Sequence, residues 1–130
     1  MERIRAGSVE LNWDPKTRFG NIGYHSGPNP QGQDGRELVE AMTRWLGAEP
    51  RPFGLFGDCA KMAGGDPEYR AIWARFYQEH REIAYIALFN MAPAFRVATE
   101  MFCLGTGVRM KVFSTEEESR SWLRQAGLSA

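Results

Sequence analysis

The residues best suited to chemistry lie near the middle of the chain, at Asp58, Cys59 and Lys61. A cysteine that lies beside a lysine and close to a helix start can have a lowered pKa and act as a nucleophile. Such a cysteine also needs a base, and the two histidines, His25 and His80, fall in a predicted loop and at the end of a predicted helix. We therefore expect Cys59 to fill a position at a strand end, and an enzyme that uses Cys59 is only a third hypothesis.

Metal and cofactor motifs are missing from the sequence. The histidines and cysteines do not have the spacing of metal ligands. Gly64 and Gly65 could hold an anion at the start of a helix, but Asp66 would place a negative charge there. The segment matches neither a phosphate-binding loop nor a dinucleotide-binding fingerprint. We expect no catalytic residue, no metal and no cofactor.

Alternating and continuous apolar segments predict the strands. Ser8–Trp13 alternates polar and apolar residues, and Phe19–Tyr24 follows it after a turn at Asp14–Thr17, so the two form a predicted hairpin. Phe53–Gly57 and Ile83–Phe89 are continuous apolar runs, which are typical of buried strands. A last segment, Val108–Phe113, alternates as a more exposed strand would.

Four helices are predicted between and after these strands, each with a residue that favours a helix start. Aspartate and threonine side chains accept hydrogen bonds from the first backbone amides, and proline fits the first turn. Large apolar residues recur at helical spacing in each segment, and glycines such as Gly47, Gly107 and Gly127 end three of them. The predicted starts are Asp34, Asp66 with Pro67, Pro93, and Thr115 with Glu118.

The order of these elements predicts one α/β domain over residues 1–130, with the later strands parallel. Ligands of such sheets bind beyond the carboxyl ends of the strands. Large aromatic residues on the helices add candidates for an interface or an apolar pocket. The predicted partner- or ligand-binding residues are Asp58, Cys59, Lys61, Met62, Asp66, Tyr69 and Trp73.

The composition excludes several classes of protein. The 130 residues carry 16 basic and 16 acidic side chains, so the net charge of zero argues against binding to nucleic acid. No segment approaches the roughly 20 apolar residues of a membrane helix, and the charged start of the chain leads into no signal segment. Two cysteines cannot form a disulfide framework. We expect a cytoplasmic protein without stable membrane insertion.

Arginine accounts for 13 of the 16 basic residues. The simpler explanation is codon usage in a GC-rich genome. The alternative is recognition of carboxylate or phosphate groups. Arginine is well suited to this recognition because it donates two parallel hydrogen bonds. That function requires arginines to cluster, and along the sequence they are spread from Arg3 to Arg124.

Three segments make the chain similar to the STAS and SpoIIAA-like superfamily, which includes bacterial anti-sigma-factor antagonists. They are the opening hairpin Val9–Tyr24, the apolar strand that ends in Asp58, and the closing segment. In the closing segment Val108–Phe113 leads into Ser114–Glu118 and then Ser121-Trp122-Leu123. The resemblance implies a mixed β-sheet with about four helices packed on it, used mainly for recognition between proteins.

The resemblance also implies a regulatory switch that this chain lacks. Antagonists of this family are phosphorylated on a serine or threonine just after the strand that ends in aspartate. Here Asp58 is followed by Cys59, and no serine or threonine occurs between Thr43 and Thr99. The added negative charge that would reverse partner binding therefore has no acceptor in this segment.

Two hypotheses about function follow. The first is a non-enzymatic, bacterial, STAS-like interaction module that binds a protein partner, or a second copy of itself as a homodimer, without the usual phosphorylation. The alternative is a carrier of a small apolar, lipid-like ligand, in which the aromatic helices cover an apolar pocket.

Overall fold

We describe a computed structural model of the chain that covers residues 1–62 and 66–129. Part of the predicted loop after Cys59, residues 63–65, lies outside the described residues. Within the described ranges the chain forms six strands and four helices, in the order β1 (Glu2–Ala6), β2 (Val9–Asp14), β3 (Phe19–Tyr24), α1 (Gly32–Leu46), β4 (Phe53–Asp58), α2 (Pro67–Glu79), β5 (Ala84–Phe89), α3 (Pro93–Thr106), β6 (Met110–Phe113) and α4 (Glu116–Gln125).

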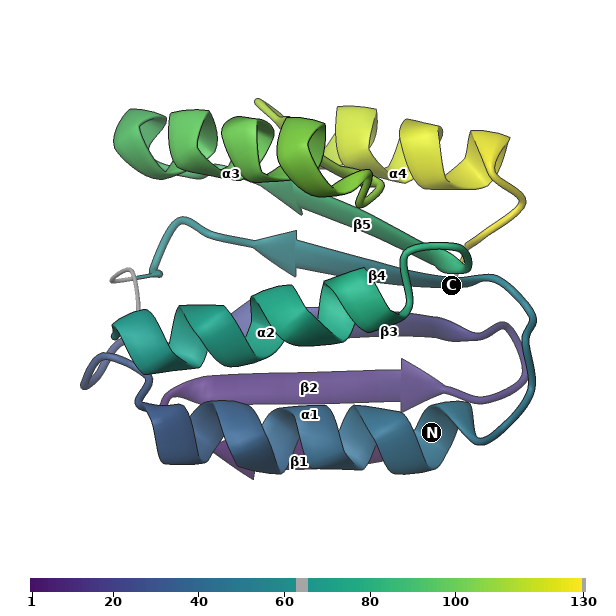
Figure 1. The fold of residues 1–130 in the computed structure, drawn as a ribbon, viewed down its shortest axis with the longest axis horizontal. Helices are drawn as coiled ribbons and strands as arrows, with labels where there is room; N and C mark the ends of the chain where they lie inside the picture. Colours follow the sequence, from purple (N-terminus) through teal and green to yellow (C-terminus); the bar gives the residue numbers. More distant parts are fainter. Residues whose placement is uncertain (63–65, 130) are drawn as a thin grey trace.

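The six strands form one mixed sheet in the order of the sequence, β1-β2-β3-β4-β5-β6 (Figure 1). The first three strands pair antiparallel, and β3 through β6 pair parallel. The predicted hairpin is confirmed, with Val9 opposite Tyr24 and Asp14 opposite Phe19. The prediction that the later strands are parallel is also confirmed.

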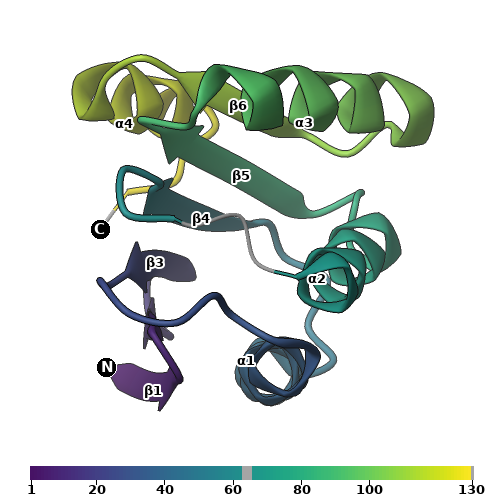
Figure 2. The same ribbon diagram turned by 90° about the vertical axis from the view of Figure 1, so that its left-hand side faces the viewer.

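The helices lie on both faces of the sheet. α1 and α2 pack against each other and cover one face, and α3 runs along the β6 side of the same layer (Figure 2). α4 contacts β4, β5 and β6 from the other face. This mixed sheet with four helices is the architecture that the sequence predicts.

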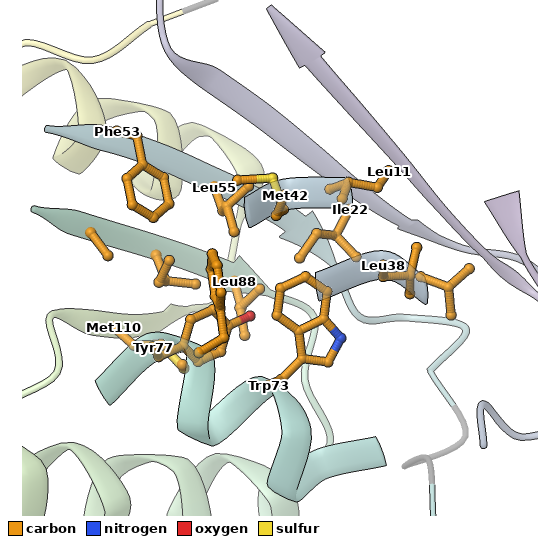
Figure 3. Close-up of a cluster of buried hydrophobic side chains, with 14 of the residues drawn as sticks. Leu11, Ile22, Leu38, Met42, Phe53, Leu55, Trp73, Tyr77, Leu88 and Met110 are labelled. Carbon is orange, nitrogen blue, oxygen red and sulfur yellow. The ribbon is translucent and has the colours of Figure 1, made fainter. Parts of the chain in front are cut away.

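Two hydrophobic clusters hold the layers together. The larger one lies between the sheet and helices α1 and α2, where Leu38 and Met42 meet Leu55 and Ile22 (Figure 3). Trp73 and Tyr77 project from α2 toward the same strands. The smaller cluster lies under α4 and centres on Phe56 and Leu123. Burial of apolar side chains on both faces is the main force that fixes the helices on the sheet.

Three predicted helix starts are confirmed, and one is displaced. Asp66 Oδ1 accepts a hydrogen bond from the Tyr69 amide at 2.7 Å, and Thr115 Oγ1 accepts one from the Glu118 amide at 3.2 Å. The third helix begins at Pro93, as predicted. The first begins three residues earlier than predicted, because Gln31 precedes the first turn and its amide donates to Asp34 Oδ2 at 2.8 Å.

The first strand, β1, is missing from the sequence-based prediction, which treats residues 1–5 only as a charged start. Glu2, Arg3 and Arg5 are exposed, because β1 is the edge strand of the sheet. Charged side chains are usual on edge strands, where they oppose pairing with other chains. A two-residue turn at Gly7 and Ser8, with a φ of 58° at Gly7, joins β1 to β2.

Candidate functional site

An apolar cavity of about 260 Å³ lies between α2 and α3, and we call it the α2–α3 groove. Among the described residues that line it, Arg70 alone is charged; the others are neutral, and most are large and apolar. Its lining is Tyr24, Met62, Tyr69, Arg70, Trp73, Ala74, Tyr77, Leu88, Met91, Phe95, Ala98, Thr99, Phe102 and Met110.

The α2 wall of the groove is rigid and aromatic. The Asp66 cap and Pro67 fix the start of α2. Tyr69, Trp73 and Tyr77 then follow at intervals of four residues, so all three fall on the inner face of the helix. The rings of Trp73 and Tyr77 stack with centroids 5.5 Å apart. At the strand end of the groove the hydroxyls of Tyr24 and Tyr69 lie 3.2 Å apart and share a hydrogen bond. This wall is held by the core and does not depend on α3.

The α3 wall is different, because no residue of α3 is fully buried. Phe95, Ala98 and Phe102 face the groove, while Val97, Met101 and Leu104 on the outer side are 59%, 67% and 88% exposed. The charged residues of α3, Arg96 and Glu100, pair with each other at 3.0 Å. α3 therefore has apolar side chains both toward the groove and on its outer side, where large apolar residues are left exposed.

Asp58 and Asn90 lie side by side at the carboxyl ends of β4 and β5. Asp58 Oδ1 accepts hydrogen bonds from the Ala60 amide at 2.9 Å and from Asn90 Nδ2 at 3.2 Å. Asn90 has a φ of 61°, a conformation that asparagine tolerates better than most residues. These contacts close the turns after the two strands, and both side chains are exposed.

Cys59 is 3% exposed and packs into the larger core cluster. Burial, with a smaller effect of the Asp58 carboxylate, raises the pKa of its thiol to about 12. The thiol is therefore protonated at neutral pH, whereas a nucleophilic cysteine must form a thiolate. This environment is the opposite of the one that activates a cysteine.

The structure brings together three of the seven predicted site residues. Met62, Tyr69 and Trp73 line the α2–α3 groove. Lys61 precedes Met62 in the sequence, but it is exposed and does not line the groove. Asp66 caps α2. Asp58 accepts hydrogen bonds in a turn, and Cys59 lies in the core, so neither lines the groove.

The α3 wall was not predicted from the sequence. The pattern predicts a helix that begins at Pro93 and ends at Gly107, but none of its residues is among the seven predicted site residues. A signal was present in the sequence: the segment from Pro93 to Thr106 has apolar residues on every side and two charges that can pair at i and i+4.

Within residues 1–62 and 66–129, none of the helices combines the length and the apolar character that crossing a membrane requires. In the same ranges, histidine, cysteine and acidic side chains do not gather in threes around a point where a metal ion could bind.

No protein-family model matches the sequence, and no curated protein matches it either. Solved structures do match. An uncharacterized protein of the DUF3478 family from Shewanella loihica, described as having a SpoIIAA-like fold, superposes with a TM-score of 0.66 at 11% identity, over 95% of this chain and 98% of that one. SiaC from Pseudomonas aeruginosa superposes with a TM-score of 0.62 at 10% identity, over 88% of this chain and all of SiaC.

SiaC has also been solved in complex with the diguanylate cyclase SiaD, of which it is the activator. That chain matches with the same TM-score of 0.62 and the same 10% identity. At such low identity the superpositions establish the fold and not the activity. The mixed sheet, its strand order and these matches together show that the chain has a SpoIIAA-like fold.

Proposed function

We propose that this chain is a non-enzymatic protein-interaction module and that its partner binds at the α2–α3 groove. The observation that carries the proposal is α3, an apolar helix with no fully buried residue beside an apolar cavity. Uncovered apolar surface of this kind marks sites of association. The match to SiaC, a protein that activates another protein, supports the same class of function.

The surroundings of Cys59 and Asp58 fit a non-enzymatic role. Cys59 is buried and protonated, and Asp58 is held in a turn. The free thiols of Cys59 and Cys103 fit a reducing compartment, so we propose the cytoplasm as the location.

The lipid-carrier alternative has less support. The groove, at about 260 Å³, is smaller than the ~300–1,000 Å³ typical of small-molecule sites. SiaC, which has the same fold, is the activator of an enzyme with which it forms a complex, and this favours a protein partner over a lipid. A cavity of this size suits one or two anchoring side chains of a protein partner.

Photo-crosslinking in the native cell tests the proposal. The photoreactive aromatic residue p-benzoylphenylalanine replaces Phe95 on the groove in one variant and Trp45, a half-buried aromatic of α1, in the control. We expect a discrete protein adduct from position 95 and none from position 45. Absence of a protein adduct at position 95, or equal adducts at both positions, would contradict the proposal.

A further inference from the structure

Arginines on α2 and just after it differ from those on the other helices in having no carboxylate partner. Arg70 and Arg75 of α2, and Arg81 just beyond it, are exposed and form no ion pair with any described residue. All arginines of α1, α3 and α4 do form ion pairs: Arg36, Arg44, Arg96, Arg120 and Arg124. These three arginines follow one another along α2 and the turn after it, and none of them is neutralised by a described carboxylate.

These three arginines border two hollows that meet at Ala74. Arg70 lines the α2–α3 groove. A shallower hollow on the outer side of α2 is lined by Arg75 and Arg81, and Ala74 belongs to both hollows. Ala74 lies between an apolar hollow edged by Arg70 and a second hollow edged by Arg75 and Arg81, so apolar and cationic surface lie on neighbouring sides of α2.

The charge along this surface is positive. Three arginines and one carboxylate, Glu79, are the charged residues that line the two hollows. The α3 wall adds no net charge, because Arg96 and Glu100 pair with each other. The whole chain is neutral, so this local excess of arginine belongs to the surface of α2 that borders the two hollows and not to the overall composition.

We propose that the groove binds an acidic amphipathic helix of a partner protein. The apolar side chains of that helix enter the cavity, and its aspartates or glutamates meet Arg70, Arg75 and Arg81. An amphipathic helix laid into an apolar groove is a common mode of recognition between proteins. This inference rests on the proposed function and adds the chemical class of the partner.

Charge complementarity selects this occupant over others. Arginine donates two hydrogen bonds to one carboxylate, and complementary charges at the rim of an interface set specificity and the rate of association. A second copy of this chain that docked through its own apolar α3 would bring one carboxylate, Glu100, which is already paired with Arg96. The small cavity also suits side-chain anchors better than a lipid tail.

Selection from a peptide library tests the charge preference directly. The library presents helices of three to four turns with leucine fixed at i, i+4 and i+7 and with aspartate, asparagine or lysine at the flanking positions. The bait is the full chain, either unchanged or with Arg70→Glu, Arg75→Glu and Arg81→Glu together. The control bait carries Arg44→Glu, an exposed arginine of α1 that lies outside the groove.

We expect aspartate to be enriched over lysine by at least about tenfold on the unchanged chain and on the Arg44→Glu control. On the triple variant the preference should reverse toward lysine. Circular dichroism of each bait shows that the variants are folded. A second variant, Leu104→Lys on the outer side of α3, should keep the aspartate preference, because Leu104 does not line the groove.

Several outcomes overturn the inference and separate it from the proposed function. Equal enrichment of aspartate, asparagine and lysine, or the same preference on the triple variant, shows that the arginines do not select the partner. If position 95 still crosslinks to a protein in cells, the proposed function stands and only the acidic helix is wrong. Binding to phosphatidylglycerol vesicles without selected peptides, or a dimer that covers the groove in light scattering, likewise assigns the groove to another occupant.

Discussion

At the scale of single residues, Arg18 is a buried charged residue that stabilises a connection between two elements of the fold. Its side chain is 5% exposed and donates to three backbone carbonyls, those of Leu46 and Glu49 at 3.3 Å and that of Arg51 at 3.0 Å. Its φ of 54° lies in the left-handed region, so the turn after β2 aims the side chain at this segment. Arg18 thereby ties the connection between α1 and β4 to the sheet.

Substitution Arg18→Ala should lower the free energy of unfolding by about 3 kcal/mol, because three carbonyls lose their donor in a buried site. Urea denaturation of the purified chain measures this loss. The control Arg44→Ala removes an exposed ion pair and should change stability by no more than about 0.5 kcal/mol. Equal stability of the two variants would show that Arg18 does not hold this connection.

Cys59 leads to a prediction about reactivity. Burial raises the pKa of its thiol to about 12, and the half-buried Cys103 has a smaller rise from the same cause. The thiolate is the reactive form, so iodoacetamide at about pH 8 should label Cys103 first and Cys59 only after unfolding. Peptide mapping of the labelled chain measures both rates. Faster labelling of Cys59 in the folded protein would contradict its buried, protonated state and reopen the enzyme hypothesis.

At the scale of elements, α3 should be the least protected of the four helices. No residue of α3 is fully buried, whereas α1 and α2 of similar length each place several side chains in the core. Local opening costs least where little apolar contact is lost. Hydrogen exchange followed by mass spectrometry should show the amides of residues 93–106 exchanging faster than those of residues 67–79. Equal protection of the two segments would mean that α3 is more firmly packed than its burial indicates.

The same contrast explains which elements could be predicted from the sequence. The starts at Asp66 and Thr115 and the end at Gly107 depend on local side chains and backbone, and all three were predicted. The strand β1 was missed because it forms only by pairing with β2, as in Ile4 opposite Leu11. Pairing of this kind depends on tertiary structure and leaves a weak local pattern.

The binding surface was less predictable than the fold for a related reason. Met62, Tyr69 and Trp73 could be named from one helix and the loop before it. The opposite wall on α3 and the arginines along α2 depend on how two helices are spaced over the sheet. Sequence alone shows Arg70 and Arg75 as two of 13 dispersed arginines. Only the fold shows that they lack carboxylate partners.

At the scale of the whole molecule, a cluster of three buried tyrosines and a buried cysteine makes the free energy of unfolding depend on pH in the alkaline range. Tyr24, Tyr69, Tyr77 and Cys59 meet near the end of the groove, and burial raises the pKa of each: to about 12 for Tyr69 and Cys59, and well above the usual value for Tyr24 and Tyr77. In the unfolded chain these groups titrate near pH 8.5 for cysteine and near pH 10 for tyrosine. The folded state therefore holds their protons more tightly.

It follows that their contribution to stability is complete below about pH 8.5 and is lost progressively as the pH rises toward about 12. Urea midpoints measured at several pH values from neutral to strongly alkaline should decline steadily over this window. Cys59→Ala serves as the matched variant: it loses some stability at every pH, but its decline between about pH 8 and 10 should be shallower, because the group that titrates first is gone. If the urea midpoint declines with the same slope in both chains, Cys59 does not titrate as a buried member of this cluster. If the midpoint does not change with pH in either chain, the tyrosines do not link stability to pH either.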